Sequence, residues 1–74
     1  MNEFEQRRLD INSKITSTGV KKYEVAKEIG IAEQTFSKKL REPTKEFQDD
    51  VEKAIRTIVS KRLKEWGKVL EEIN

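Results

Sequence analysis

The sequence predicts an all-α fold, a small helix-turn-helix bundle of four to five helices with a long C-terminal helix. Charged residues make up 41% of the 74 positions, which is typical of helices with solvated outer faces. One proline and three glycines leave little material for strands joined by tight turns. Apolar residues recur every three or four positions over most of the chain, which is the period of a helix. We expect a single domain, residues 1–74, because so short a chain forms one core.

The composition argues against several functional classes. The chain has no cysteine and no histidine, so we expect neither disulfides nor a metal site. A nucleophile would have to be a serine, and no serine lies in a glycine-rich segment. Neither a phosphate-binding loop nor a dinucleotide fingerprint is present. We therefore expect no enzymatic activity and no cofactor.

The first predicted helix covers residues 2–17. Asn2 can cap its N-terminus, and Phe4, Ile11 and Ile15 fall on one face with the aliphatic stem of Arg8 between them. Leu9 lies off that face, so it is either simply exposed or in contact with the C-terminal helix or a second subunit. The helix should end at Ser17-Thr18-Gly19.

Residues 22–41 predict two short helices joined by a tight turn. The first should end at Gly30, which can adopt the left-handed backbone conformation, with Ala26 as the small residue at the crossing. Ile31 then points inward, and Phe36 and Leu40 anchor the second helix, about residues 32–41. Helix-turn-helix units that enter the DNA major groove are built in this way.

From Thr18 to about Arg41 the chain resembles the helix-turn-helix of the Cro and lambdoid-repressor family of phage regulators. The resemblance rests on the spacing of Ala26, Gly30 and Ile31 and on the Gly19-Val20 loop that precedes them. Ala32 stands where the family often has Ser or Thr, which weakens the expected N-cap. The resemblance implies a sequence-specific regulator of transcription that binds double-stranded DNA, a Cro-like repressor. Its recognition helix, residues 32–41, would lie in the major groove of an operator.

The outward positions of that helix are the expected base contacts, Glu33, Gln34, Ser37 and Lys38. Glu33 could instead serve only to complement the helix dipole. A second group of basic residues is suited to the DNA phosphates: Lys21, Lys22, Lys39, Arg41 and Lys45. The charge distribution agrees, because residues 14–45 carry +4 whereas residues 1–13 and 46–74 carry −1 each.

After the break at Pro43, Thr44 is a good N-cap for the C-terminal helix, about residues 45–73. This helix is either continuous or broken near Ser60 or Gly67. Residues 47–58 should close the core. Its last part, residues 60–73, either folds back onto the first helix and buries Leu9 or pairs with a second subunit. The apolar residues of this dimer or partner surface are Leu63, Trp66, Leu70 and Ile73.

A second hypothesis assigns the protein to a different class. Small phage proteins of this kind can modulate transcription by binding a partner such as a repressor, in which case the apolar C-terminal face would be the docking surface. An accessory role in excision would share the DNA chemistry of the first hypothesis. In each case we expect a protein of the cytoplasm, in a bacterial cell or a phage-infected host, with no membrane partner. The reason is that no apolar run reaches the ~18–20 residues that span a bilayer.

Overall fold

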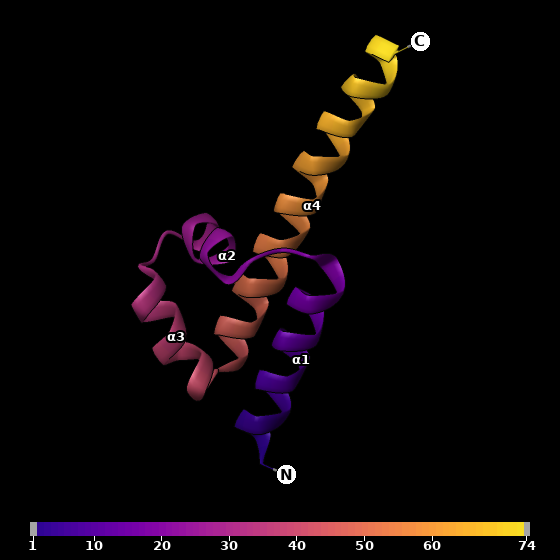
Figure 1. Ribbon diagram of the computed structural model, residues 1–74. Coiled ribbons are helices and arrows are strands. Elements are labelled where there is room, and N and C mark those ends of the chain that lie inside the picture. The colour runs from indigo at the N-terminus through magenta and orange to yellow at the C-terminus, as the bar shows by residue number, and fades with distance from the viewer. Residues whose placement is uncertain (1, 74) are drawn as a thin grey trace.

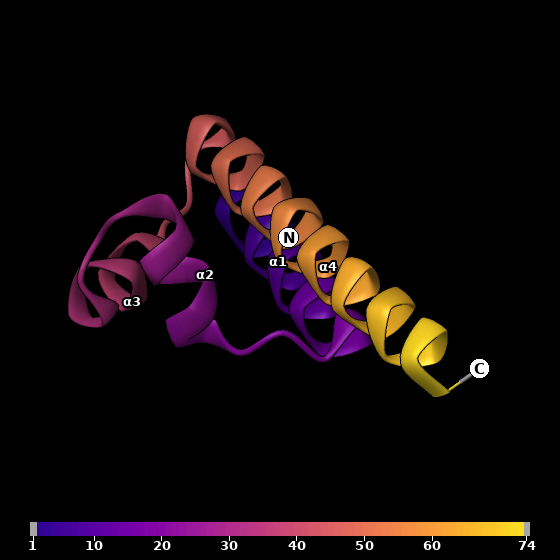
Figure 2. The same ribbon diagram turned by 90° about the horizontal axis from the view of Figure 1, so that it is seen from above.

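The computed structural model describes residues 2–73, and side chains for residues 2–72. Over this range the chain forms four helices and no strand, which confirms the all-α prediction and decides for four helices rather than five. They are α1 (Glu3–Thr18), α2 (Lys22–Ile29), α3 (Glu33–Arg41) and α4 (Lys45–Ile73). In Figure 1 and Figure 2, α1 and α4 lie side by side and run in the same direction, with α2 and α3 on one side of them.

The helices begin and end at the capping residues that the sequence predicts. The Asn2 side chain accepts a hydrogen bond from Glu5 N–H at 2.8 Å, and Thr44 Oγ1 accepts one from Phe47 N–H at 3.1 Å. Gly19 and Gly30 end α1 and α2 with φ of 71° and 89°, a region that favours glycine. At the second of these, Ile31 N–H donates to Ala26 C=O at 3.0 Å, which turns the chain sharply toward α3.

The core lies where α1, α2, α3 and the first half of α4 meet. Phe36 of α3 is fully buried, and its ring meets that of Phe47 of α4 edge-on with centroids 5.4 Å apart. These two rings join α3 to α4. The buried apolar residues are Ile11, Ile15, Val20, Val25, Ala26, Phe36, Leu40, Phe47, Val51, Ala54 and Ile55. Ile58 packs against this core while remaining partly exposed.

The N-terminal half of α1 differs from the prediction. Phe4 is exposed, and Arg7 rather than Arg8 is the partly buried arginine. Arg7 Nη1 donates to the carbonyl oxygen of Pro43 at 3.3 Å, and the Arg7 guanidinium lies 6.0 Å from the centre of the Phe4 ring. At this end of α1 the neighbour is therefore the backbone of the loop between α3 and α4, whereas the apolar pattern predicted buried core side chains there.

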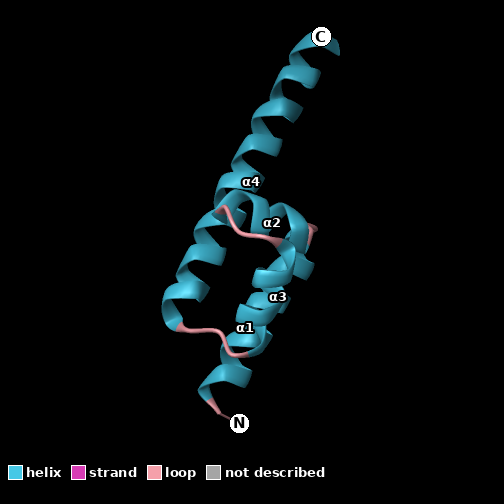
Figure 3. Ribbon diagram, turned by 90° about the vertical axis from the view of Figure 1, so that its left-hand side faces the viewer, coloured by secondary structure: helices cyan, strands magenta, loops and turns pink. Residues whose placement is uncertain are grey.

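α4 is one continuous helix of 29 residues and extends well beyond the other three, as Figure 3 shows. It does not fold back, and Leu9 stays half exposed, so the fold-back alternative was wrong. Two ion pairs hold α4 against α2 near residue 62, where the contact between α4 and the bundle ends. They join Arg62 to Glu24, and Lys61 to Glu28 at 3.4 Å. No helix among the described residues is long and apolar enough to cross a membrane.

Candidate nucleic-acid interface

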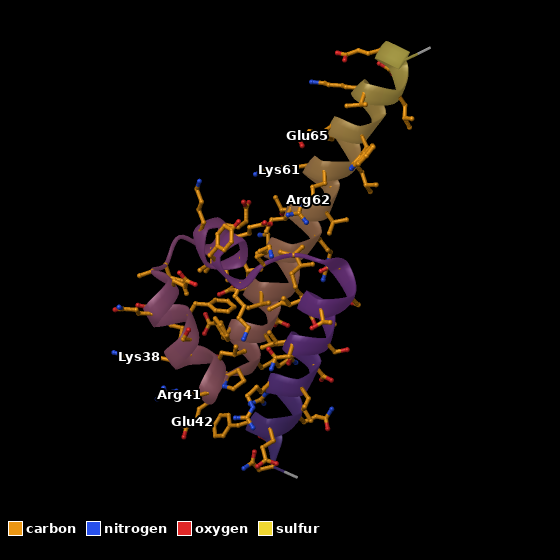
Figure 4. All side chains as sticks on the ribbon, viewed as in Figure 1. Lys38, Arg41, Glu42, Lys61, Arg62 and Glu65 are labelled. Atoms are coloured by element: carbon orange, nitrogen blue, oxygen red, sulfur yellow. The ribbon has the colours of Figure 1, made fainter. Side chains whose placement is uncertain are left out.

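The exposed face of α3 is the surface that the sequence singled out. With Phe36 and Leu40 buried, a rotation of about 100° per residue puts Gln34, Lys38 and Arg41 on the opposite side of the helix. All three are exposed, and Lys38 and Arg41 project away from the bundle in Figure 4. Ser37 is exposed on the flank of this row. Arg41 was expected to contact phosphate, yet it lies in line with two of the expected base contacts.

A shallow depression joins the start of α2 to the start of α3. Its lining includes Lys21, Lys22, Tyr23 and Glu33, together with residues at the end of α1 and in the loop that follows it. Two of the expected phosphate contacts therefore lie beside Glu33, which is one of the expected base contacts. Glu33 itself is exposed in the first turn of α3, where its charge also complements the helix dipole.

The N-termini of α2 and α3 lack the side-chain caps that α1 and α4 have. The N-cap positions are Lys21 and Ala32, and neither side chain makes a capping hydrogen bond. The first backbone N–H groups of both helices are thus left for solvent or for an anion. The two lysines and the N–H groups at the start of α2 form a positive region, and Glu33 at the start of α3 lines the same depression.

The loop between α3 and α4 positions the remaining basic side chains. Arg7 holds the Pro43 carbonyl, and Thr44 caps α4, so the backbone on both sides of Pro43 is fixed. Lys45 is exposed at the start of α4.

Lys39 faces α4 and not the outward side of α3, because it lines a second shallow depression with the acidic residues Glu42, Glu46 and Asp50. Of the expected phosphate contacts, Lys39 is therefore the one that lies among acidic side chains.

The acidic residues of this region are unevenly distributed. Seven basic and four acidic residues fall between positions 21 and 45. Two of the acidic ones, Glu24 and Glu28, form the ion pairs with α4. Within the described part of the chain none of the seven basic side chains forms an ion pair. The positive charge around α3 is consequently stronger than the net charge of the segment indicates.

The pairing of Glu24 and Glu28 with α4 was not predicted. Arg62 and Lys61 lie more than 30 positions away in sequence, so no local pattern connects the two pairs. The direction of Arg41, by contrast, could have been found by counting helical positions from Phe36 and Leu40.

The expected dimer or partner surface on α4 is uncovered. Leu63, Trp66 and Leu70 are 67%, 65% and 57% exposed, and Val69 beside them is 44% exposed. The side chain of Ile73 lies outside the described residues. Among the described residues no group of acidic side chains is arranged to hold a metal ion.

Comparison with known proteins found no match for this chain. No family model matches it, and no curated protein and no solved structure matches it either.

Proposed function

We propose that the protein is a sequence-specific DNA-binding regulator of transcription that inserts α3 into the major groove of an operator. The proposal is carried mainly by the two faces of α3. Phe36 and Leu40 fix the helix to the core, and the opposite face presents exposed polar and basic side chains to solvent. A helix with its side chains is about 10–12 Å across, which fits a major groove about 12 Å wide, and α3 with its nine residues is about 13 Å long.

The outward row supplies the chemistry for reading bases. The Gln34 amide can donate to and accept from adenine at once, and Lys38 can donate to the O6 and N7 atoms of guanine. Arg41, in line with both, can make a two-pronged contact with guanine or with a phosphate. Ser37, on the flank of this row, can donate to or accept from adenine or guanine. We assign discrimination between sequences chiefly to Gln34 and Lys38.

The positive region at the start of α2 supplies affinity that does not depend on sequence. Lys21 and Lys22, with the uncapped N–H groups of α2, would bind one DNA strand at the edge of the groove. Lys45 would contact the backbone on the far side of α3. Each neutralised phosphate adds about −0.9 to the slope of log affinity against log salt concentration, so binding should weaken steeply as salt is raised.

Occupancy of an operator would then regulate transcription by excluding the polymerase or a competing regulator. The described chain is taken up by the helical bundle and α4.

A second candidate is a modulator that binds a partner protein, such as a phage repressor, instead of DNA. The exposed apolar residues of α4 favour it, since uncovered groups of this kind mark interaction surfaces. The basic face of α3 would then have no role.

Binding to the DNA that flanks the gene, measured over a salt series, tests the first candidate. Gln34→Ala and Lys38→Ala should each lose about 1–3 kcal/mol on the preferred sequence, about 5- to 150-fold in affinity, with little change on random DNA. Lys68→Ala, which removes the same charge as Lys38→Ala but lies on the far part of α4, is the matched control and should bind as the wild type does. Equally weak binding of all four proteins to every duplex would reject the operator and favour the partner-binding candidate.

A further inference from the structure

The last part of α4 carries an apolar stripe that no other part of the described chain covers. We define the α4 stripe as Leu63, Trp66 and Leu70, each more than half exposed. Their spacing of three and four residues puts them on one side of the helix, with Val69 at one edge and Ser60 and Gly67 at the other. The opposite side is charged, and Lys61 and Glu65 of that side are labelled in Figure 4.

A single copy gives this part of α4 little to keep it helical. Every side chain from Leu63 to Glu72 is exposed, so the bundle contributes nothing beyond Arg62. Isolated helices shorter than about 12–15 residues are marginal in water, and a glycine inside a helix is less favourable than an alanine. A Cβ on Gly67 would meet no atom within 4 Å, so the single copy gives no reason for the glycine.

The charge order along this part of α4 is also unfavourable in isolation. Lys61, Arg62 and Lys64 come first, whereas Glu71 and Glu72 come last. The last turn contains no basic residue, so its two carboxylates face the negative end of the helix dipole without compensation. A partner should therefore cover the α4 stripe and also bring positive charge to the end of the helix.

A second copy in the opposite direction satisfies both needs. Pairing in the same direction would bring the two acidic ends together, where neither copy has a basic residue after Lys68, so the carboxylates at the helix end would stay uncompensated. Pairing in the opposite direction lays the basic beginning of one stripe along the acidic end of the other. The charge order thus selects an antiparallel arrangement.

We propose that two copies of the chain pair through the α4 stripe as an antiparallel two-helix coiled coil whose two-fold axis passes close to Gly67 and Lys68. In this register Trp66 packs against Leu70 of the second copy, and Leu70 against its Trp66. Lys64 faces Glu71 of the second copy, and the same contact recurs across the axis. Ser60 and Gly67, the small residues at that edge, let the long Lys64 side chain reach across.

The arrangement has a measurable shape. One copy extends 51 Å along its longest axis. Two copies that overlap by about 14 residues of α4, about 21 Å, give a particle about 80 Å long. Pairing in the same direction would keep the length near that of one copy. The proposal does not depend on DNA binding, so its test contains no DNA.

The first test follows mass and tryptophan emission from about 1 μM to about 1 mM protein, a range that covers weak and moderate dimers. The mass should rise from 8.7 kDa to twice that value. Since Trp66 is the single tryptophan, its emission should shift to shorter wavelength over the same range. Trp66→Ala should stay monomeric with the bundle intact by circular dichroism, because residue 66 lies outside the core. Glu65→Ala, on the charged side, is the control and should pair as the wild type does.

The second test addresses direction. Lys64→Glu and Glu71→Lys should each weaken pairing about three- to tenfold, because each places like charges opposite one another twice. The double variant Lys64→Glu/Glu71→Lys should restore it. In pairing with a common direction residues 64 and 71 lie about two turns apart along the dimer, so the double variant would restore nothing.

The results that would overturn the proposal are distinct from those that bear on DNA binding. A protein that stays monomeric with constant emission over the whole range excludes a second copy and leaves the stripe for a different protein. A dimer that persists in Trp66→Ala uses another surface. A dimer shorter than about 60 Å by small-angle scattering, or one that the double variant fails to restore, is not antiparallel.

Discussion

At the scale of single residues, the helix N-caps divide into two kinds. Asn2 and Thr44 close α1 and α4 with side-chain hydrogen bonds. Lys21 and Ala32 leave α2 and α3 without such caps. A good N-cap contributes about 1 kcal/mol, so the pair of short helices gives up stability at its two open ends. An anion that binds there would restore part of it.

Ala32 offers a direct test of this division. Ala32→Ser should cap α3 and raise the free energy of unfolding by about 0.5–2 kcal/mol, measured by chemical denaturation. Ala32→Asp should stabilise the fold to a similar extent, but its negative charge would meet the phosphates, so DNA affinity should fall about tenfold. If the aspartate variant binds DNA as tightly as the serine variant, the start of α3 does not approach the DNA backbone.

At the scale of elements, α4 combines two different environments in one helix. Up to Arg62 it is part of the bundle, through Phe47, Val51 and the ion pairs with α2. Beyond Arg62 all its described side chains are exposed. Only the first half draws its stability from the core, so the second half should open more readily.

Gly67 makes that difference measurable. In dilute protein, where one copy prevails, Gly67→Ala should strengthen the end of α4 by about 1 kcal/mol and raise the helical signal in circular dichroism. Amide protons beyond residue 62 should exchange more slowly in the variant, while those of residues 47–58 should not change. Unchanged exchange in both segments would mean that the end of α4 is already held by something other than its own propensity.

The element boundaries were predictable because they depend on local chemistry. Asn2, Gly19, Gly30 and Thr44 each act within three or four positions of themselves, and the structure uses all of them as expected. The exposed position of Phe4 was not predictable. At this end of α1 the long-range contact is the one from Arg7 to Pro43, across 36 positions, which no periodic pattern contains.

The candidate interface follows the same rule. The outward row of α3 could be derived from its own two buried anchors, Phe36 and Leu40. The orientation of Lys39 toward acidic residues at the start of α4 could not, since it depends on how α3 and α4 pack. The sequence also could not decide whether the end of α4 folds back, because Gly67 is compatible both with a continuous helix and with a break.

At the scale of the whole molecule, the charges of distant segments compensate one another. The bundle has a positive side around α3, and two of the carboxylates that would reduce it are occupied by α4. This arrangement favours the approach of a polyanion to α3.

On the proposed function, the ion pairs between α2 and α4 allow DNA affinity to be tuned from residues 61 and 62, which lie outside the proposed interface. In Lys61→Ala/Arg62→Ala, Glu24 and Glu28 would lose their counter-charges and lower the potential around α3. Affinity at low salt should fall about two- to tenfold, because the two uncompensated carboxylates would repel the DNA phosphates. The control is Lys64→Ala/Lys68→Ala, which removes the same charge farther along α4. Measured in dilute protein, where one copy prevails, it should lower affinity less. Equal losses in the two double variants would mean that net charge alone sets the effect. Substitutions that accumulate on α4 could thus adjust operator occupancy gradually while every contact to the bases is retained.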